Sequence, residues 1–407
     1  MQTALADFIR DTPEGREADA ILRKCVHCGF CNATCPTYQL LGDELDGPRG
    51  RIYLIKQVLE GAAPTEKTRL HLDRCLTCRA CESTCPSGVQ YGRLADIGRA
   101  IVEEKVGRGA RDQLKRAALS FALPRTGLFA FFLLLGRIAK PILPASLQGK
   151  IPARGEPAGA WPAPRHKRRM LVLAGCVQPA LAPAINAAAA RVLDRSAISL
   201  IEAPGAGCCG AVRFHLNEQQ AGRGDMRALI DAWWPLIESG AIEAIVMTAS
   251  GCGSTVKEYG HLLRHDPAYR EKAARISAIT RDLSEIVPEI QLKQKKPGRV
   301  AFQSPCSLQH GQQIRGRVEA LLQSAGYELA PVADGHLCCG SAGTYSILQP
   351  ELSEKLRERK LAALAAGGAE TIATANIGCL SHLQAGTRMP PSGTRVRIVH
   401  WIQLLDE

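Results

Sequence analysis

The sequence predicts an α + α/β protein in which an all-helical domain is followed by two tandem α/β domains. The first evidence is a pair of matching cysteine motifs within residues 1–100, joined by segments of helical period such as residues 50–61. The second is one cysteine pattern that occurs in both residues 169–290 and residues 298–407. The third is a strand–helix–strand rhythm in both copies, which is typical of a parallel sheet. Residues 101–168 lie between these parts as a basic, partly apolar helical linker.

The elements of the two copies are expected at matching places. Short apolar runs predict strands that end at the first cysteine of each copy, and longer periodic runs predict helices after them. Cysteines at the carboxyl ends of parallel strands lie where such sheets usually place their sites. The expected strands are 168–176 and 198–204 in the first copy and 297–306 and 327–332 in the second, with helices at 182–196 and 311–326.

Sixteen cysteines in 407 residues are the informative feature of the composition. The N-terminus has no basic start followed by an apolar run, so it does not resemble a signal peptide. We therefore expect a reducing cytoplasm, where disulfides are rare. Cysteines in such a chain are better interpreted as metal ligands or redox groups.

The two N-terminal motifs are Cys-x2-Cys-x2-Cys-x3-Cys-Pro runs, a pattern that binds cubane [4Fe–4S] clusters. In this pattern the fourth cysteine turns toward the other cluster. Zinc is the alternative metal, but two complete copies disfavour it. His27 lies within the first motif and is expected to pack or to donate a hydrogen bond beside the cluster. The predicted ligands are Cys25, Cys28, Cys31 and Cys85 for cluster 1, and Cys75, Cys78, Cys81 and Cys35 for cluster 2.

The C-terminal copies share the pattern Cys…Cys-Cys-Gly…Gly-Cys. In each copy the first cysteine lies 32 positions before the Cys-Cys-Gly site, and this equal offset indicates duplication. These cysteines are candidates for a further metal site or a dithiol redox site, and the alternative is that they pack as small buried hydrophobes. They are Cys176, Cys208, Cys209 and Cys252 in the first copy, and Cys306, Cys338, Cys339 and Cys379 in the second.

A glycine pattern at 205–210 matches G-x-G-x-x-G, but it does not predict nucleotide binding here. The second copy, at 335–340, lacks the middle glycine, so the repeated feature is Cys-Cys-Gly. No phosphate-binding loop and no flavin or nicotinamide motif is found in the sequence. Two-electron oxidation of an organic substrate such as an alcohol or a hydroxyacid needs a flavin or nicotinamide as first acceptor, so we expect electrons to arrive from a separate subunit.

The linker holds most of the net charge. Residues 105–170 contain fourteen Lys and Arg but only Asp112 and Glu156, which gives +12. Within them, residues 126–136 form an apolar run of eleven residues, too short to span a bilayer, which takes about 20. This segment either lies in a membrane interface, with Phe131 and its neighbours in the lipid, or packs on protein.

The runs CVHCGFCNATCPTYQLLGDELDGPRGRIYLIKQVLEG, CLTCRACESTCPSGV, CCGAVRFHLN, TASGCGSTVKEYG, HLCCGSAGTY and TANIGC together resemble the iron–sulfur subunits of bacterial glycolate oxidase (glycolate dehydrogenase). The resemblance covers nearly the full length. It implies a helical two-cluster ferredoxin-like domain and two Cys-Cys-Gly domains. It also implies a complex with FAD-containing subunits that oxidise glycolate to glyoxylate, an oxidoreductase acting on CH–OH groups.

The resemblance further implies that this chain passes electrons toward the membrane quinone pool and holds no catalytic residue. We expect a cytoplasmic protein at the inner face of the cell membrane, with no nucleic-acid partner. Alternatives are the iron–sulfur subunit of a lactate or glycerol-3-phosphate dehydrogenase, or a heterodisulfide reductase-type redox enzyme. The last binds noncubane clusters through repeats that finish in C-x2-C. Here Cys252 and Cys379 lack a partner cysteine at that spacing, which disfavours noncubane clusters.

Overall fold

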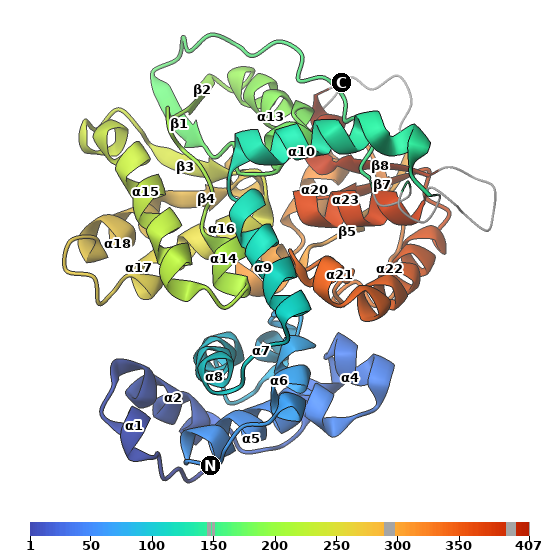
Figure 1. Ribbon diagram of the computed structural model, residues 1–407. Coiled ribbons are helices and arrows are strands. Elements are labelled where there is room, and N and C mark those ends of the chain that lie inside the picture. The colour runs from blue at the N-terminus through green and yellow to red at the C-terminus, as the bar shows by residue number, and fades with distance from the viewer. Residues whose placement is uncertain (145–147, 149–150, 289–297, 388–395, 407) are drawn as a thin grey trace. The chain divides into compact units, whose positions relative to one another are not determined.

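The computed structural model describes residues 1–144, 148, 151–288, 298–387 and 396–406. Parts of the expected linker and of the second copy, and the junction between the copies, lie outside these residues. The chain forms two compact units, which interleave along the sequence (Figure 1). Unit 1 contains residues 1–116 and 336–356, and unit 2 contains residues 117–335 and 357–407. The four regions drawn from the sequence stay a prediction.

Unit 1 is helical, which confirms the predicted class of the N-terminal domain. Its core is formed by apolar side chains of α2, α5, α6 and α8, including the fully buried Leu22, Ile55 and Leu94. Its elements through residue 105 are α1 (Asp7–Arg10), α2 (Pro13–Lys24), α3 (Phe30–Ala33), α4 (Pro36–Leu41), η1 (Glu44–Asp46), α5 (Pro48–Leu59), α6 (Glu66–Asp73), α7 (Ala80–Thr84) and α8 (Tyr91–Lys105). The segment 336–356 adds α21 (Tyr345–Leu348) and the start of α22 (Pro350–Ala365).

Unit 2 contains two four-stranded parallel sheets with the same topology. The first has the order β2-β1-β3-β4 and the second has the order β6-β5-β7-β8. Identical orders confirm that the two cysteine-rich copies fold as tandem α/β repeats. The strands are β1 (Arg168–Val172), β2 (Ile198–Glu202), β3 (Ala244–Met247), β4 (Thr280–Asp282), β5 (Arg299–Gln303), β6 (Glu328–Leu329), β7 (Thr371–Thr374) and β8 (Arg397–His400).

Helices connect the parallel strands and bury their apolar runs, as parallel pairing requires. All four residues of β3 are buried. The remaining elements are α9 (Ala110–Ala122), α10 (Thr126–Ala139), η2 (Lys140–Ile142), α12 (Gln178–Leu181), α13 (Ala184–Asp194), α14 (Ala211–His215), α15 (Gln219–Glu238), α16 (Ser250–Lys257), α17 (Tyr259–Leu262), α18 (Arg270–Ile279), α19 (Leu283–Ile286), the π-helical turn η3 (Ser307–Gly311), α20 (Arg317–Ser324), α23 (Ile377–Gly386) and η4 (Trp401–Leu405).

The strands expected to end at Cys176 and Cys306 end earlier, at Val172 in β1 and Gln303 in β5. Two further elements of the second copy are shorter than the sequence predicted. The expected helix 311–326 forms only as α20, because Gly316 takes a left-handed φ of +69° at the helix N-cap and separates it from η3. The strand expected at 327–332 is reduced to β6, and Pro331 cannot donate a ladder hydrogen bond there.

The apolar run of the linker forms α10. Among the described residues, no single helix combines the length and apolar character needed to cross a bilayer. The helix 110–122 and the segment 126–142 meet the criterion only as a pair, and they are bent by 113° at their junction.

Candidate metal centre

The two N-terminal motifs form loops with the same backbone conformation. His27 and Thr77, which occupy equivalent positions, have φ values of 55° and 52°. Gly29 and Arg79, after the second cysteine of each motif, have φ values of 86° and 61°. Left-handed residues at both places turn each loop tightly. A short helix follows in each case, α3 in the first motif and α7 in the second, and carries the third cysteine.

Tetrad 1 is the name we give to Cys25, Cys28, Cys31 and Cys85. Burial raises the pKa of the Cys31 thiol to about 11, and the other three thiols of the tetrad contribute to its electrostatic environment. The same four cysteines line one open pocket, together with Cys81 of the second motif. The fourth cysteine of the second motif therefore lies with the first three of the first motif.

Tetrad 2 consists of Cys75, Cys78, Cys81 and Cys35. Burial raises the pKa of the Cys81 thiol well above its usual range, and the thiols of Cys78, Cys75 and Cys35 add to that shift. Burial also opposes ionisation of Cys75, but the positive charges of Arg51 and Arg99 outweigh it and lower the Cys75 pKa. The structure thus groups the cysteines in the crossed arrangement described for the sequence, while their role as ligands stays a prediction.

The two tetrads differ in exposure. In tetrad 1 Cys28 is exposed and only Cys25 is buried. In tetrad 2 Cys35 and Cys81 are buried and the other two are partly buried. A cluster on tetrad 1 would therefore lie nearer to solvent than a cluster on tetrad 2.

The residues around the tetrads suit iron–sulfur clusters. Each tetrad offers four soft sulfur ligands, which is the usual ligand set of a [4Fe–4S] cluster. His27 lines the tetrad 1 pocket, and its buried Nε2 has no hydrogen-bond partner among the described residues. Burial and the charge of Arg49 lower the His27 pKa, so the ring is neutral and one nitrogen carries a proton. This agrees with a hydrogen-bonding role for His27 beside a cluster.

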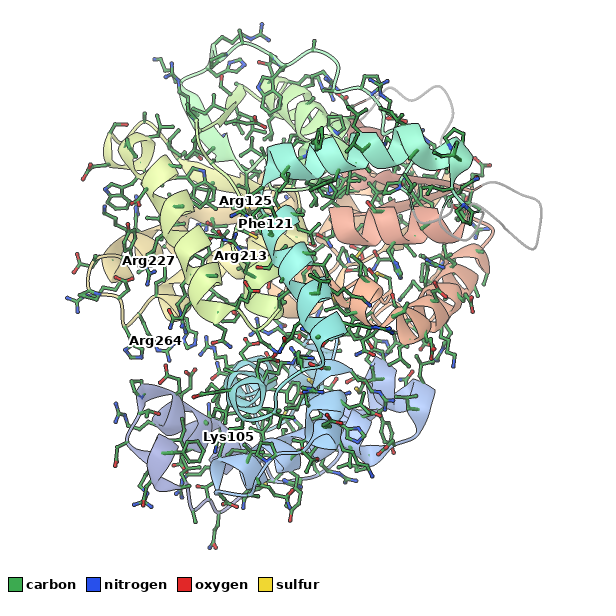
Figure 2. The ribbon with its side chains drawn as sticks, in the orientation of Figure 1. Lys105, Phe121, Arg125, Arg213, Arg227 and Arg264 are labelled. Carbon is green, nitrogen blue, oxygen red and sulfur yellow. The ribbon has the colours of Figure 1, made fainter. Side chains whose placement is uncertain are left out.

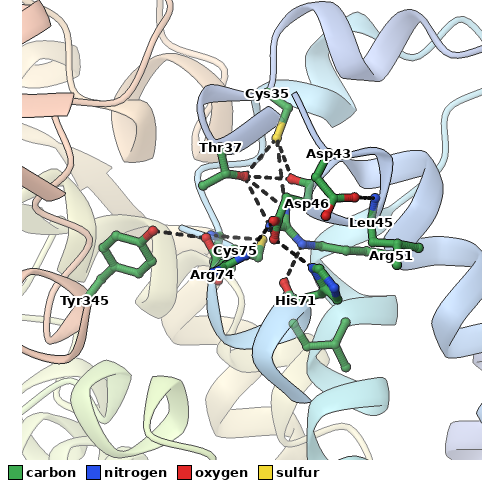
Figure 3. Close-up of polar contacts among 12 residues, drawn as sticks. Cys35, Thr37, Asp43, Leu45, Asp46, Arg51, His71, Arg74, Cys75 and Tyr345 are labelled. Carbon is green, nitrogen blue, oxygen red and sulfur yellow. Dashed lines mark hydrogen bonds and ion pairs between the residues drawn. The ribbon is translucent and has the colours of Figure 1, made fainter. Parts of the chain in front are cut away.

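A buried charged network lies beside tetrad 2 and was not anticipated from the sequence (Figure 3). Asp46 is fully buried. Its carboxylate accepts hydrogen bonds from Arg74 Nη1 at 2.8 Å, His71 Nδ1 at 3.1 Å and Arg51 Nη2 at 3.4 Å. Thr37 donates its hydroxyl to the carbonyl oxygen of Asp46 at 2.8 Å. One signal in the sequence was available: Arg51 shares a face of α5 with Ile55 and Val58, where a charge needs a partner.

The same network contains a group of possible cation ligands. Oxygen and nitrogen atoms of Asp43, Asp46 and His71 lie within 4.8 Å of one another. Arg51 and Arg74 already neutralise Asp46, so this group is poorly suited to a cation.

The first Cys-Cys-Gly copy brings its four cysteines together in unit 2. Cys176 and Cys209 both interact with Cys208, and Cys252 interacts with Cys209. Hydrogen bonds from Cys176 and Cys209 lower the Cys208 pKa, and the Gly210 amide adds an N–H···S bond at 3.4 Å. We call these four residues the thiol quartet. Such a group can bind a thiophilic metal or form a disulfide.

The glycine of each Cys-Cys-Gly site has a steric reason. Gly210 and Gly340 have left-handed φ values of +84° and +90°. A Cβ at Gly210 would lie 2.5 Å from the Gly222 carbonyl oxygen, and one at Gly340 would lie 2.6 Å from that of Ser353. Both the backbone conformation and the close approach of a neighbouring helix therefore require glycine.

The second copy distributes its cysteines over both units. Cys306 and Cys379 belong to unit 2, and Cys338 and Cys339 belong to unit 1. Cys338 Sγ accepts the Gly340 amide at 3.4 Å, as Cys208 accepts that of Gly210. Cys379 Sγ accepts Asn376 Nδ2 at 3.7 Å.

A charged group surrounds the end of α9 near the thiol quartet. Arg213 binds Asp225 at 2.5 Å and donates to the Ser120 carbonyl oxygen at 3.3 Å. Burial and the charge of Cys208 raise the Asp225 pKa to about 6. Arg125 stacks 4.2 Å above the Phe121 ring (Figure 2).

Comparison with known proteins gives consistent matches. A 4Fe-4S dicluster domain family matches residues 21–89, and a cysteine-rich domain family matches residues 170–257 and 300–384. The glycolate oxidase iron-sulfur subunit of Escherichia coli is 53% identical over 100% of this chain and 99% of its own length. The probable glycolate oxidase iron-sulfur subunit of Bacillus subtilis is 31% identical over 95% of this chain and 94% of its own.

One solved structure shares the fold. The crystal structure of a hypothetical protein from Helicobacter pylori aligns with a TM-score of 0.54 at 11% identity, over 96% of this chain and 71% of that one.

Proposed function

Since this chain belongs to the family of glycolate oxidase iron–sulfur subunits, we propose that it is the electron-transfer subunit of a glycolate-oxidising complex. In this proposal an FAD-containing partner oxidises glycolate to glyoxylate. This chain accepts the electrons singly and passes them toward quinone. The observation that carries the proposal is the pair of four-thiol groups in a 4Fe-4S dicluster domain.

We further propose that tetrad 1 and tetrad 2 each hold one [4Fe–4S] cluster. When bound, such clusters supply reversible one-electron transfer. The grouping of the eight thiols and the unpaired Nε2 of His27 support this ligand assignment. The chain's own residues would exclude water from tetrad 2, whose Cys35 and Cys81 are buried, and leave tetrad 1 more accessible.

The association of this chain with the inner membrane face is also a proposal. Phe131, Phe132, Leu134, Leu135 and Ile138 on α10 are between 45% and 67% exposed. The basic residues Arg125 and Arg137 lie at the start and in the last turn of this helix, within the +12 segment of residues 105–170. An apolar helix face with basic residues around it suits the interface of an anionic membrane.

Two measurements test the central proposal. Anaerobically purified chain should contain about eight iron atoms and eight acid-labile sulfides, since two cubanes hold that number. Glycolate added to the complex with its FAD-containing partner should then produce the EPR signals of reduced clusters, and quinone should remove them. Stoichiometric zinc without sulfide, or clusters that glycolate never reduces, would contradict it.

A second activity is favoured by one observation, the thiol quartet of the first copy. Four thiols that share hydrogen bonds in a buried site suit either a further metal or a dithiol–disulfide couple. An iron or zinc content clearly above the two cubanes, lost in Cys208→Ser with Cys209→Ser, would support the metal. A disulfide reductase activity lost in the same variant would support the couple.

A further inference from the structure

We propose that Arg51 and Arg99, two buried arginines beside tetrad 2, raise the reduction potential of cluster 2 above that of cluster 1, so that a single electron rests on cluster 2. The inference rests on the proposed function, because it assumes a cluster on each tetrad. It concerns positioning residues, which act on a cluster through its surroundings.

Arg51 is held beside Cys35 from several sides. Its Nη1 lies 4.0 Å from Cys35 Sγ, and both terminal nitrogens bind the Thr37 hydroxyl at 3.2 Å. Its Nε donates to the His71 carbonyl oxygen at 2.7 Å, and the residue is 1% exposed. These bonds fix a permanent positive charge at the sulfur that crosses from the first motif (Figure 3).

Arg99 supports the other end of tetrad 2. Its Nη2 donates to the carbonyl oxygens of Cys75 and Leu72 at 2.7 and 2.9 Å, and its Nη1 donates to the Thr77 hydroxyl at 2.8 Å. Arg99 is 8% exposed. It therefore carries a second buried positive charge against the loop that holds Cys75.

The acids beside tetrad 2 do not cancel these charges. Asp46 is shared between Arg51 and Arg74, at 3.4 and 2.8 Å. Glu82 follows Cys81 and is paired with Arg79 at 3.1 Å. Asp43 also lies within 4.8 Å of Asp46. Four arginines thus face three carboxylates, which leaves an excess of one positive charge.

Tetrad 1 has a different environment. Arg49 is paired with Glu44 at 2.6 Å, and the side chains are 38% and 40% exposed. Two further cations act near this tetrad: the amino group of Met1, which donates to the Cys25 carbonyl oxygen at 2.8 Å, and Lys56, which is paired with Glu60. The exposed Cys28 brings solvent close to this tetrad, so that water and salt screen its charges.

The difference in potential follows from these surroundings. Reduction adds one negative charge to a cluster, and a nearby fixed cation stabilises the reduced form. The stabilisation is larger at a buried site, where the effective dielectric constant is low, than at an exposed one. Burial by itself disfavours the added charge at cluster 2, and solvent favours it at cluster 1. The fixed, buried charges of Arg51 and Arg99 outweigh this difference in solvation and place the electron on cluster 2.

The test is an EPR-monitored redox titration of the full-length, anaerobically purified chain. Cys28→Ser, at the exposed ligand of tetrad 1, identifies the signal of cluster 1 by altering its shape. Wild-type protein should show the higher midpoint potential for the other signal. Arg51→Met should lower the equilibrium constant for reduction of cluster 2 about tenfold, which lowers its midpoint potential by about 59 mV for a one-electron couple. Arg51→Lys should restore most of it.

Two further variants keep the inference testable if Arg51→Met does not fold. Arg99→Gln should also lower the midpoint potential of cluster 2. Arg49→Gln, at tetrad 1, should leave the midpoint potential of cluster 2 unchanged. A higher potential for cluster 1, or equal shifts in Arg51→Met and Arg51→Lys, would overturn the inference. Such results with both clusters present would leave the proposed function standing, whereas a chain without clusters would refute that function.

Discussion

The hydroxyl of Tyr345 donates a hydrogen bond of 3.1 Å to the carbonyl oxygen of Arg74, the residue before the first cysteine of tetrad 2. Tyr345 lies in residues 336–356, which also carry Cys338 and Cys339 and belong to unit 1. The Cys-Cys-Gly site of the second copy is thereby tied to the loop that holds Cys75. The same bond gives a direct test of how firmly this segment is held in unit 1.

Tyr345→Phe should loosen residues 336–356 without removing a cluster ligand. A hydrogen bond of this kind contributes about 1 kcal/mol, so amide hydrogen exchange in this segment should become about fivefold faster. Tyr327→Phe is the matched control, because Tyr327 donates a similar bond at 3.0 Å to the Leu404 carbonyl oxygen within unit 2. Unchanged exchange in 336–356 would show that the bond does not hold the segment.

Gly210→Ala should destabilise the first Cys-Cys-Gly site more than a left-handed backbone alone explains. An alanine at positive φ costs roughly 1–2 kcal/mol, and here its Cβ also meets the Gly222 carbonyl oxygen. Gly175→Ala is the control, since Gly175 has a φ of +80° and open space around it. In urea denaturation followed by pulse proteolysis, Gly210→Ala should therefore unfold at a lower urea midpoint than Gly175→Ala. Equal midpoints would refute the steric explanation.

The stability of unit 2 should respond to pH through His400. This residue is fully buried, its Nε2 donates to the Thr248 carbonyl oxygen at 2.9 Å, and its Nδ1 accepts the Ile402 amide at 3.4 Å. Burial lowers the His400 pKa to about 4. The unfolded chain binds a proton near pH 6.5 and the folded chain does not. Stability present above pH 6.5 is therefore lost as pH falls toward 4, by on the order of 3 kcal/mol.

Asp282 opposes this dependence in the same pH range. Burial raises its pKa to about 6, so the folded chain holds this proton more tightly than the unfolded chain. The contribution of Asp282 to the stability of the folded chain is greatest at low pH and is lost as pH rises from about 3.8 to 6.

Because the two effects oppose each other, the stability of the wild-type chain should change little with pH between about 4 and 6.5. Asp282→Asn should reveal a steep loss of stability on acidification, and His400→Gln should reverse the slope. Hydrogen exchange of β7 and β8 amides, corrected for intrinsic rates, measures both. Parallel profiles in the two variants would contradict the assignment.

Local patterns in the sequence predicted much of this structure. The cysteine spacings imply the tight motif loops, and the equal 32-residue offsets imply two copies of one α/β topology, which the sheet orders confirm. The surroundings of tetrad 2 were not predictable in this way. Arg51, Asp46 and Thr37 meet His71 and Arg74 only through the packing of α5, η1 and α6. The inclusion of residues 336–356 in unit 1 likewise depends on tertiary packing and on no local signal.

The exposed face of α10 gives the last prediction. Phe131→Ser combined with Phe132→Ser should weaken binding of the full-length chain to phosphatidylcholine vesicles that contain phosphatidylglycerol. The two rings are 54% and 51% exposed. Losing their transfer into the interface costs more than about 1.4 kcal/mol, so affinity should fall at least tenfold. Ile347→Ser is the matched control, because Ile347 is 46% exposed but lies on α21.

The same vesicle experiment also tests the role of charge, by varying the salt concentration and the anionic lipid. Binding should decline as salt rises and should be weak for vesicles of phosphatidylcholine alone, because residues 105–170 carry a formal charge of +12. Cosedimentation measures both effects. If the double variant and Ile347→Ser bind equally well, α10 is not the lipid contact. Its apolar face must then be covered by protein, and the same double variant should instead fail to assemble with the FAD-containing partner.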